Sequence, residues 1–137
     1  MKRTASAHWE GDLKAGKGNL STQSTTLNKT QYSFNTRFAD GVGTNPEELL
    51  AAAHAGCFTM AISSILGEAG FTATSLDTNA AVTLEGLAIT GVHLSIQGKV
   101  PNISEDKFKE IVKAAEQGCL VSKVLKIPIT SDATLIK

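Results

Sequence analysis

Two cysteines, Cys57 and Cys119, are the residues of this sequence best suited to covalent chemistry, and they are its only thiols. Cys57 lies in an alanine-rich run, where a cysteine is most often an inert, buried packing residue. Cys119 directly follows Gly118, which ends one helical pattern, and precedes another. We therefore expect Cys119 at a helix N-terminus, where backbone N–H groups favour a thiolate. Packing and redox chemistry both remain open as roles for the two thiols.

Arg37 and Glu47 are candidate partners of a reactive thiol. Arg37 lies in residues 32–38, which we predict to be a strand. If only the aromatic side of this strand is buried, Arg37 faces solvent; if both sides are covered, it needs a carboxylate, and its planar donors then suit a thiolate or an oxygen substrate. Glu47 and Glu48 begin the helix that carries Cys57. At about 100° per residue, Glu47 lies about 80° from Cys57 and Glu48 lies opposite, although both acids also complement the helix dipole.

His54 precedes Cys57 by three residues and so shares its side of the predicted helix. This spacing raises two hypotheses, a Cys–His pair and a metal site. Two cysteines and one histidine fall short of a structural zinc set, and CxxC and HxxxH spacings are missing, so we predict no metal. The sequence has no flavin, haem or nucleotide motif either, and we predict no bound cofactor.

The elements that position these residues follow from periodicity and capping residues. Strand signals punctuated by glycine predict an antiparallel meander of residues 6–13, 19–24 and 32–38. The long helix that carries Cys57 is expected to begin after Asn45 as N-cap, with Glu48 completing a capping box, and to end near residue 69 at Gly70.

The second half of the chain continues with two strands, residues 76–84 and 87–100. The second strand changes phase near Thr90 and Gly91, which predicts a β-bulge. An amphipathic helix is expected from Ser104 to Gly118, followed by one or two helical turns over residues 120–125 and a closing strand over 127–135. This order predicts a single α+β domain over residues 1–137, with largely antiparallel sheets wrapped around a long central helix.

The amino-acid composition limits the classes of partner that this protein is expected to bind. Charged residues make up 19% of the 137 residues, against about 25% in an average domain, and such a low fraction often accompanies a surface covered in an oligomer. Thirteen Lys and Arg balance thirteen Asp and Glu, which argues against a nucleic-acid partner. The N-terminus lacks a signal-peptide pattern, and the apolar window 49–66 is too rich in Ala and Ser for a membrane span. We expect a cytoplasmic protein without a membrane partner.

Several runs of residues together resemble the family of osmotically inducible protein C (OsmC) and organic hydroperoxide resistance (Ohr) thiol peroxidases. They extend over almost the whole chain, and the Asn-Thr-Arg-Phe run is similar to the OsmC branch. The runs are Ala7-His8-Trp9-Glu10-Gly11-Asp12, Asn35-Thr36-Arg37-Phe38, Thr44-Asn45-Pro46-Glu47-Glu48-Leu49, Ala52-Ala53-His54-Ala55-Gly56-Cys57-Phe58, Gly67-Glu68-Ala69-Gly70-Phe71 and Gly118-Cys119-Leu120-Val121-Ser122.

The resemblance implies a fold and a site. Cys57 takes the position of the peroxidatic cysteine, Cys119 that of the resolving cysteine, Arg37 that of the activating arginine and Glu47 that of the carboxylate holding it. The resemblance also implies an OsmC-like, intertwined homodimer with two sites at the subunit interface. Leu120 stands where the family usually has proline, so the helix start at Cys119 loses a fixed φ and a slower resolving step is expected.

The resemblance implies a cysteine-based peroxidase involved in oxidative or osmotic stress, and the residue types fit peroxidase chemistry. A thiolate attacks a hydroperoxide, and the resulting sulfenic acid condenses with the second thiol to a disulfide. Many Ala and Leu around the helix suggest an apolar pocket and organic hydroperoxides as substrates. Reduction is expected from an external dithiol, for which the family suggests a lipoylated protein. The alternatives are a non-catalytic dimeric stress or binding protein and a redox sensor.

Overall fold

The computed structural model describes all 137 residues, which divide into an N-terminal unit, residues 1–49, and a C-terminal unit, residues 50–137. The N-terminal unit contains one antiparallel sheet in the order β1-β2-β3 and a short helix α1. Helix α2 (Pro46–Glu68) begins in this unit and continues in the next. The other elements of the N-terminal unit are β1 (Ala5–Glu10), β2 (Lys17–Thr22), β3 (Thr30–Tyr32) and α1 (Phe34–Phe38). The single domain over residues 1–137 stays a prediction.

The predicted strand at residues 32–38 is wrong. Strand β3 ends at Tyr32 and the chain turns into helix α1, which carries Arg37. Ser33 is the N-cap of α1: its hydroxyl accepts from the Thr36 N–H, and the Thr36 hydroxyl accepts from the Ser33 N–H, which is a reciprocal capping box. These two bonds satisfy donors that a strand would have left to a neighbour, so the local cap overrides the β propensity of the aromatic residues.

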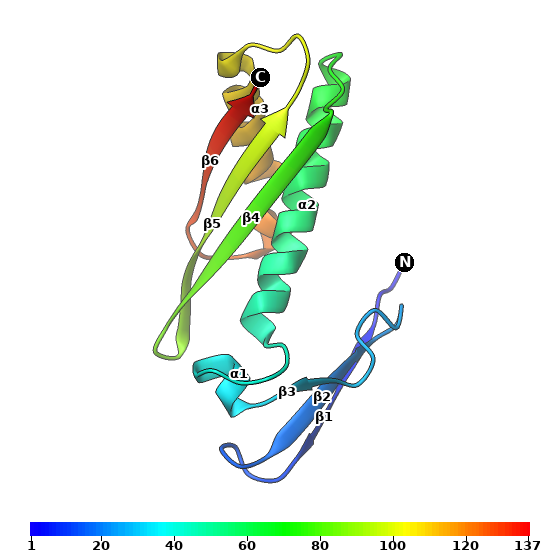
Figure 1. Cartoon of the computed structure of the whole chain (residues 1–137), viewed down its shortest axis with the longest axis vertical. Coiled ribbons are helices and arrows are strands. Elements are labelled where there is room, and N and C mark those ends of the chain that lie inside the picture. The colour runs from blue at the N-terminus through cyan, green and yellow to red at the C-terminus, as the bar shows by residue number, and fades with distance from the viewer. The chain divides into compact units, whose positions relative to one another are not determined.

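The C-terminal unit contains a second sheet in the order β4-β5-β6, with β4 and β5 antiparallel and β5 and β6 parallel. Helices α2 and α3 run along one side of this sheet (Figure 1). The α+β class with a long central helix and mainly antiparallel pairing is confirmed. The elements of this unit after α2 are β4 (Ser75–Glu85), β5 (Ala88–Lys99), α3 (Glu105–Gly118), α4 (Leu120–Val124) and β6 (Ile129–Ile136).

One hydrophobic core joins α2, β5 and α3. Its buried residues come from all three elements and pack against partly buried residues of β4 and β6. Gly98 of β5 is required here, because a side chain at this position would collide with the Phe108 ring of α3. Helix α2 is long and apolar enough to cross a membrane by length and composition alone, but it also carries part of this core. The α2 residues of the core are Phe58, Ile62 and Leu66.

Several predicted signals are confirmed. The Asn45 side chain caps α2, the Ser104 side chain caps α3, and α3 ends at Gly118. The β4–β5 register shifts at Thr83 and Leu84, where Thr90 of β5 has no partner, so the predicted bulge is present. These signals act within a few residues of where they stand, which is why they are readable from the sequence.

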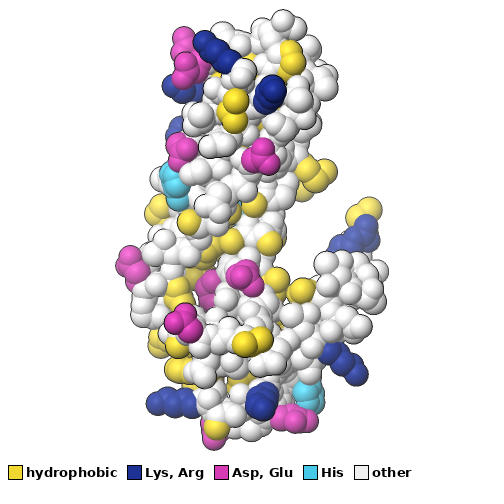
Figure 2. Space-filling model, viewed as in Figure 1, with side chains coloured by type: hydrophobic (Ala, Val, Ile, Leu, Met, Phe, Trp, Pro, Cys, Tyr) yellow, Lys and Arg dark blue, Asp and Glu magenta, His cyan; other side chains and the backbone are white.

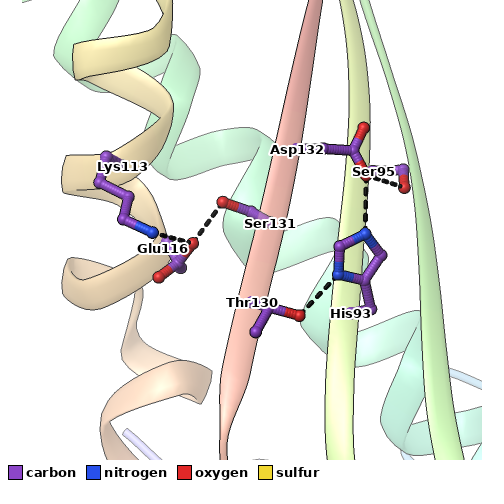
Figure 3. A network of polar contacts seen from close by, with 7 residues as sticks. All are labelled: His93, Ser95, Lys113, Glu116, Thr130, Ser131 and Asp132. Atoms are coloured by element: carbon purple, nitrogen blue, oxygen red, sulfur yellow. Dashed lines mark hydrogen bonds and ion pairs between the residues drawn. The ribbon is translucent and has the colours of Figure 1, made fainter.

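The carboxylate of Glu116 fastens α3 to β6. It is 2% exposed and accepts hydrogen bonds from Ser131 of β6 and from Lys113 over 3.2 Å (Figure 3). It also accepts a hydrogen bond from Gln117 over 2.7 Å. Burial raises the pKa of Glu116, but the hydrogen bonds from Ser131, Lys113 and Gln117 outweigh it and hold the pKa below its ordinary value. Because α3 leads directly into Cys119, this contact also helps to fix the position of that thiol.

A second network lies on the exposed side of the same sheet. His93 contacts Thr130 and Asp132, and Ser95 donates to the same Asp132 oxygen over 2.7 Å (Figure 3). Hydrogen bonds from Ser95 and His93 lower the pKa of Asp132. Both side chains of the His93–Asp132 pair are about half exposed, so water screens the pair and its contribution to stability is small.

The buried network at Glu116 and the exposed network at Asp132 allow a matched test of how burial changes the contribution of a hydrogen bond to stability. Ser131→Ala removes a donor from buried Glu116 and should lower the free energy of unfolding by about 1.5–3 kcal/mol at neutral pH. Folded Glu116 has a lowered pKa, so this stabilisation is present above its ordinary value of 4.5 and is lost as the pH falls through the folded value. Urea unfolding at neutral pH and in acid measures both effects.

Ser95→Ala is the control, because it removes the same kind of bond from the exposed Asp132. Its unfolding free energy should stay within about 0.5 kcal/mol of the parent protein. If both variants lost the same free energy of unfolding, burial of Glu116 would not be what makes its hydrogen bond important.

Candidate functional site

Arg37 and Glu47 form an ion pair within the N-terminal unit. Nε of Arg37 donates to Oε1 of Glu47 over 2.8 Å. The Glu47 side chain is 10% exposed, whereas that of Arg37 is 44% exposed. Glu47 Oε2 is buried without a partner, and the only hydrogen bond of the guanidinium is the one from Nε. The carboxylate thus holds Arg37 by one edge and leaves its Nη donors free for another acceptor.

Asn45 ties together the two helices that carry this pair. Its Nδ2 donates to the carbonyl of Thr36 in α1 over 2.9 Å, and its Oδ1 accepts from the Glu48 N–H in α2 over 2.7 Å. The Glu48 carboxylate accepts from the Thr44 hydroxyl instead. The two adjacent acids therefore have different surroundings: Glu47 is buried against the guanidinium, and Glu48 is exposed.

A cavity of about 290 Å³ lies beside Arg37 in the same unit. Its other walls are Trp9, Leu13, Tyr32, Ser33, Phe34 and Phe38. The Trp9 and Tyr32 rings are 5.5 Å apart between centroids, and the Arg37 guanidinium carbon lies 5.3 Å from the centre of the Phe38 ring. An apolar pocket was expected from the Ala and Leu residues around the long helix; this one is aromatic and comes from the N-terminal unit. It combines apolar walls with one cation.

Cys57 lies at the edge of the buried side of α2. The seam of this side is made by residues that recur every four positions and are fully buried: His54, Phe58, Ile62 and Leu66. Cys57 stands next to this seam, is partly buried and carries a free thiol. His54 is the one polar residue of the seam in the C-terminal unit, and it lies one helical turn before Cys57.

Cys119 is linked to His54 through Ser122. Cys119 is the N-cap of α4, and its Sγ accepts from the Ser122 N–H over 3.3 Å, so the predicted helix start is confirmed. Ser122 Oγ lies 3.0 Å from Cys119 Sγ and 2.7 Å from His54 Nε2. Burial lowers the pKa of His54, so the imidazole is neutral at neutral pH. The three side chains form a buried hydrogen-bonded chain.

The structure bears on the two hypotheses for His54, a Cys–His pair and a metal site. His54 hydrogen-bonds a serine hydroxyl, which in turn contacts a cysteine, so the link to a thiol runs through Ser122. The structure has no group of three or more His, Cys, Asp or Glu side chains that could hold a metal ion. Ser122 was not singled out from the sequence; its spacing of three from a helix-capping residue was the one available signal.

Fold and site together define an α+β protein with two free thiols, one in its central helix and one at a helix start. The family model for OsmC-like proteins matches residues 39–133, and this chain belongs to the OsmC family. The resemblance drawn from the sequence runs is confirmed.

Relatives match over nearly the full length. Peroxiredoxin OsmC of Escherichia coli (strain K12) is 53% identical over 139 residues, covering 98% of this chain and 97% of the relative. Peroxiredoxin OsmC of Shigella flexneri matches to the same extent. An OsmC-like protein from Vibrio cholerae has a TM-score of 0.75 at 15% identity, covering 97% of this chain and 99% of that one. The organic hydroperoxide resistance protein OhrB of Bacillus subtilis has a TM-score of 0.67 at 22% identity, covering 97% and 98%. These two structures share the fold.

Proposed function

We propose that this protein is a thiol peroxidase that reduces organic hydroperoxides to alcohols with Cys57 as the attacking residue. The observation that carries the proposal is the free edge of the Arg37 guanidinium at the wall of an aromatic cavity, in a chain 53% identical to a peroxiredoxin. The cavity suits the organic group of the substrate, and the Nη donors suit its peroxide oxygens.

The first step uses the Cys57 thiolate. It attacks the distal oxygen of ROOH, the O–O bond breaks, and the leaving alkoxide takes up a proton to become ROH. Cys57 is left as a sulfenic acid. Arg37 stabilises the thiolate and the negative charge that develops on oxygen, and Glu47 fixes the orientation of the guanidinium.

The second step uses Cys119. Its thiol condenses with the Cys57 sulfenic acid, water leaves, and a Cys57–Cys119 disulfide forms. An external dithiol then reduces the disulfide, and a lipoylated protein is our proposed donor. This cycle needs no bound cofactor, because both electrons come from the dithiol.

Serine variants separate the two steps. Cys57→Ser should abolish consumption of cumene hydroperoxide, because a serine alkoxide is not available at neutral pH. Cys119→Ser should consume one equivalent and then stop, with Cys57 trapped as sulfenic or over-oxidised acid. Peroxide assays and mass spectrometry of the two cysteine peptides measure these outcomes.

Thiol titration of the parent protein is the control for this pair. One equivalent of cumene hydroperoxide should remove both thiols and form one intramolecular disulfide. Unchanged thiols would favour the alternative of a non-catalytic dimeric stress protein, and oxidation without turnover in excess dithiol would favour a redox sensor.

Substitutions of Arg37 separate the effect of its positive charge from the effect of its planar guanidinium. Arg37→Lys should slow peroxide reduction nearly as much as Arg37→Ala, because an ammonium keeps the charge but not the planar donors. Glu47→Gln should slow the same step, whereas Glu48→Gln should not, because only Glu47 holds the guanidinium. The rate of Cys57 alkylation against pH, measured beside the peroxidase rate, checks these variants. Equal behaviour of the two glutamine variants would exclude the role of Glu47.

The active form is proposed to be a cytoplasmic, intertwined homodimer with two sites at the subunit interface. Helix α2 is apolar, yet only 22% of its most apolar stretch is buried within one chain. An open stripe of mostly small residues runs along it: Ala52, Gly56, Met60, Ser63 and Gly67. On the face drawn in Figure 2, charges of both signs are interspersed and hydrophobic side chains lie open between them. Such a stripe lets a second helix approach closely.

Met60 tests this interface, because it is 75% exposed on the stripe of α2. Met60→Asp would bury an unpaired charge in the dimer and should yield monomers by sedimentation equilibrium. Leu87→Asp is the control, since Leu87 is 91% exposed in the turn between β4 and β5 and should leave the dimer intact. A parent protein that sediments as a monomer would overturn the proposal.

A further inference from the structure

The proposed resolving thiol, Cys119, is buried, and this creates a problem of proton transfer. Cys119 is 2% exposed, so bulk water has little access to its thiol. Attack on a sulfenic acid requires the thiolate, and the thiol proton must therefore move to a group inside the protein. The only side chain that hydrogen-bonds to Cys119 Sγ is Ser122.

Ser122 leads on to a base. Its Oγ lies between Cys119 Sγ, 3.0 Å away, and His54 Nε2, 2.7 Å away. His54 is fully buried, and its Nδ1 has no hydrogen-bond partner. A buried imidazole with one bonded and one orphaned nitrogen carries a free-energy cost that packing alone does not explain. The Glu116 carboxylate, three residues before Cys119 in the sequence, is already occupied by Ser131, Lys113 and Gln117.

We propose that Ser122 and His54 form a proton relay that takes the proton of the Cys119 thiol as the disulfide forms. This inference rests on the proposed peroxidase cycle and adds two residues to its second step. Ser122 touches a reacting atom, and His54 acts through Ser122. The neutral imidazole has a lone pair that can accept a proton, and because burial lowers the pKa of His54, the imidazole holds that proton only until it is passed on.

The relay balances in atoms and charge. The Cys119 thiol gives its proton to Ser122 Oγ, while the Ser122 hydroxyl proton passes to His54 Nε2. The Cys119 thiolate then attacks the sulfur of the Cys57 sulfenic acid, the S–S bond forms and the S–O bond breaks. The leaving hydroxide combines with the proton from His54 to form water. His54 lies one helical turn before Cys57 on α2.

The hydroxyl and the imidazole can also be read as an anchor that merely holds α4 against α2. Two substitutions distinguish the anchor from the relay. His54→Gln keeps a side-chain amide able to bond Ser122 but cannot take up a proton. Ser122→Thr keeps the hydroxyl, whereas Ser122→Ala removes it.

The experiment is a single turnover of the reduced, full-length protein with one equivalent of cumene hydroperoxide. Samples are quenched in acid, and mass spectrometry follows the Cys57 sulfenic acid, trapped with dimedone, and the Cys57–Cys119 disulfide. Loss of peroxide should keep its rate in every variant. Disulfide formation should slow at least about tenfold in His54→Gln and in Ser122→Ala, with the sulfenic acid accumulating, and should recover in Ser122→Thr.

Thr59→Val is the matched control, because it removes a hydroxyl of α2 that bonds Thr78 over 2.6 Å outside the relay. Disulfide formation at the parental rate in His54→Gln would overturn the relay, even if Ser122→Ala were slow. A Ser122→Thr variant as slow as Ser122→Ala would overturn it as well. A parent protein that forms no sulfenic acid or no Cys57–Cys119 disulfide would instead refute the proposed function itself.

Discussion

The burial of one side of helix α2 is the constraint on which the remaining structure depends. Its apolar residues lie on all sides, yet it also carries two buried polar residues, Glu47 in the N-terminal unit and His54 in the C-terminal unit. Buried polar groups need partners, because water is no longer available to them. Arg37 supplies the partner of Glu47 in the N-terminal unit, and Ser122 supplies that of His54 in the C-terminal unit. The first contact holds α1 beside the first turn of α2 within the N-terminal unit, and the second holds α4 beside α2 within the C-terminal unit.

Features that depend on neighbouring residues could be predicted from the sequence. The Asn45 cap, the bulge at Thr90 and the helix start at Cys119 are each determined by backbone bonds or side-chain parity within a few positions. Even the difference between Glu47 and Glu48 follows from helical phase, because one position on a helix turns the side chain by about 100°. In the structure, burial and partners separate the two acids in the same way.

Features that depend on distant residues could not be predicted. The His54–Ser122 bond joins positions 68 residues apart, and nothing in the composition around Ser122 indicates its partner. The aromatic cavity likewise draws residues from β1, β3 and α1. The error at residues 32–38 has a different origin: alternating aromatic residues have high β propensity, and the capping bonds of Ser33 and Thr36 outweigh it. Arg37 consequently lies on a helix, and its orientation cannot follow from strand parity.

Helix α4 explains why so much depends on Ser122. A helix of five residues has too few internal hydrogen bonds to be stable by itself, and Leu120 lacks the fixed φ that a proline would give its first turn. The Cys119 cap and the bond from Ser122 to His54 must therefore hold it in place. The position of the Cys119 sulfur and a path for its proton then depend on the same hydroxyl group. A residue at this position must reach both Sγ and Nε2 with one atom that donates and accepts, and among small side chains the hydroxyls of serine and threonine do both strongly.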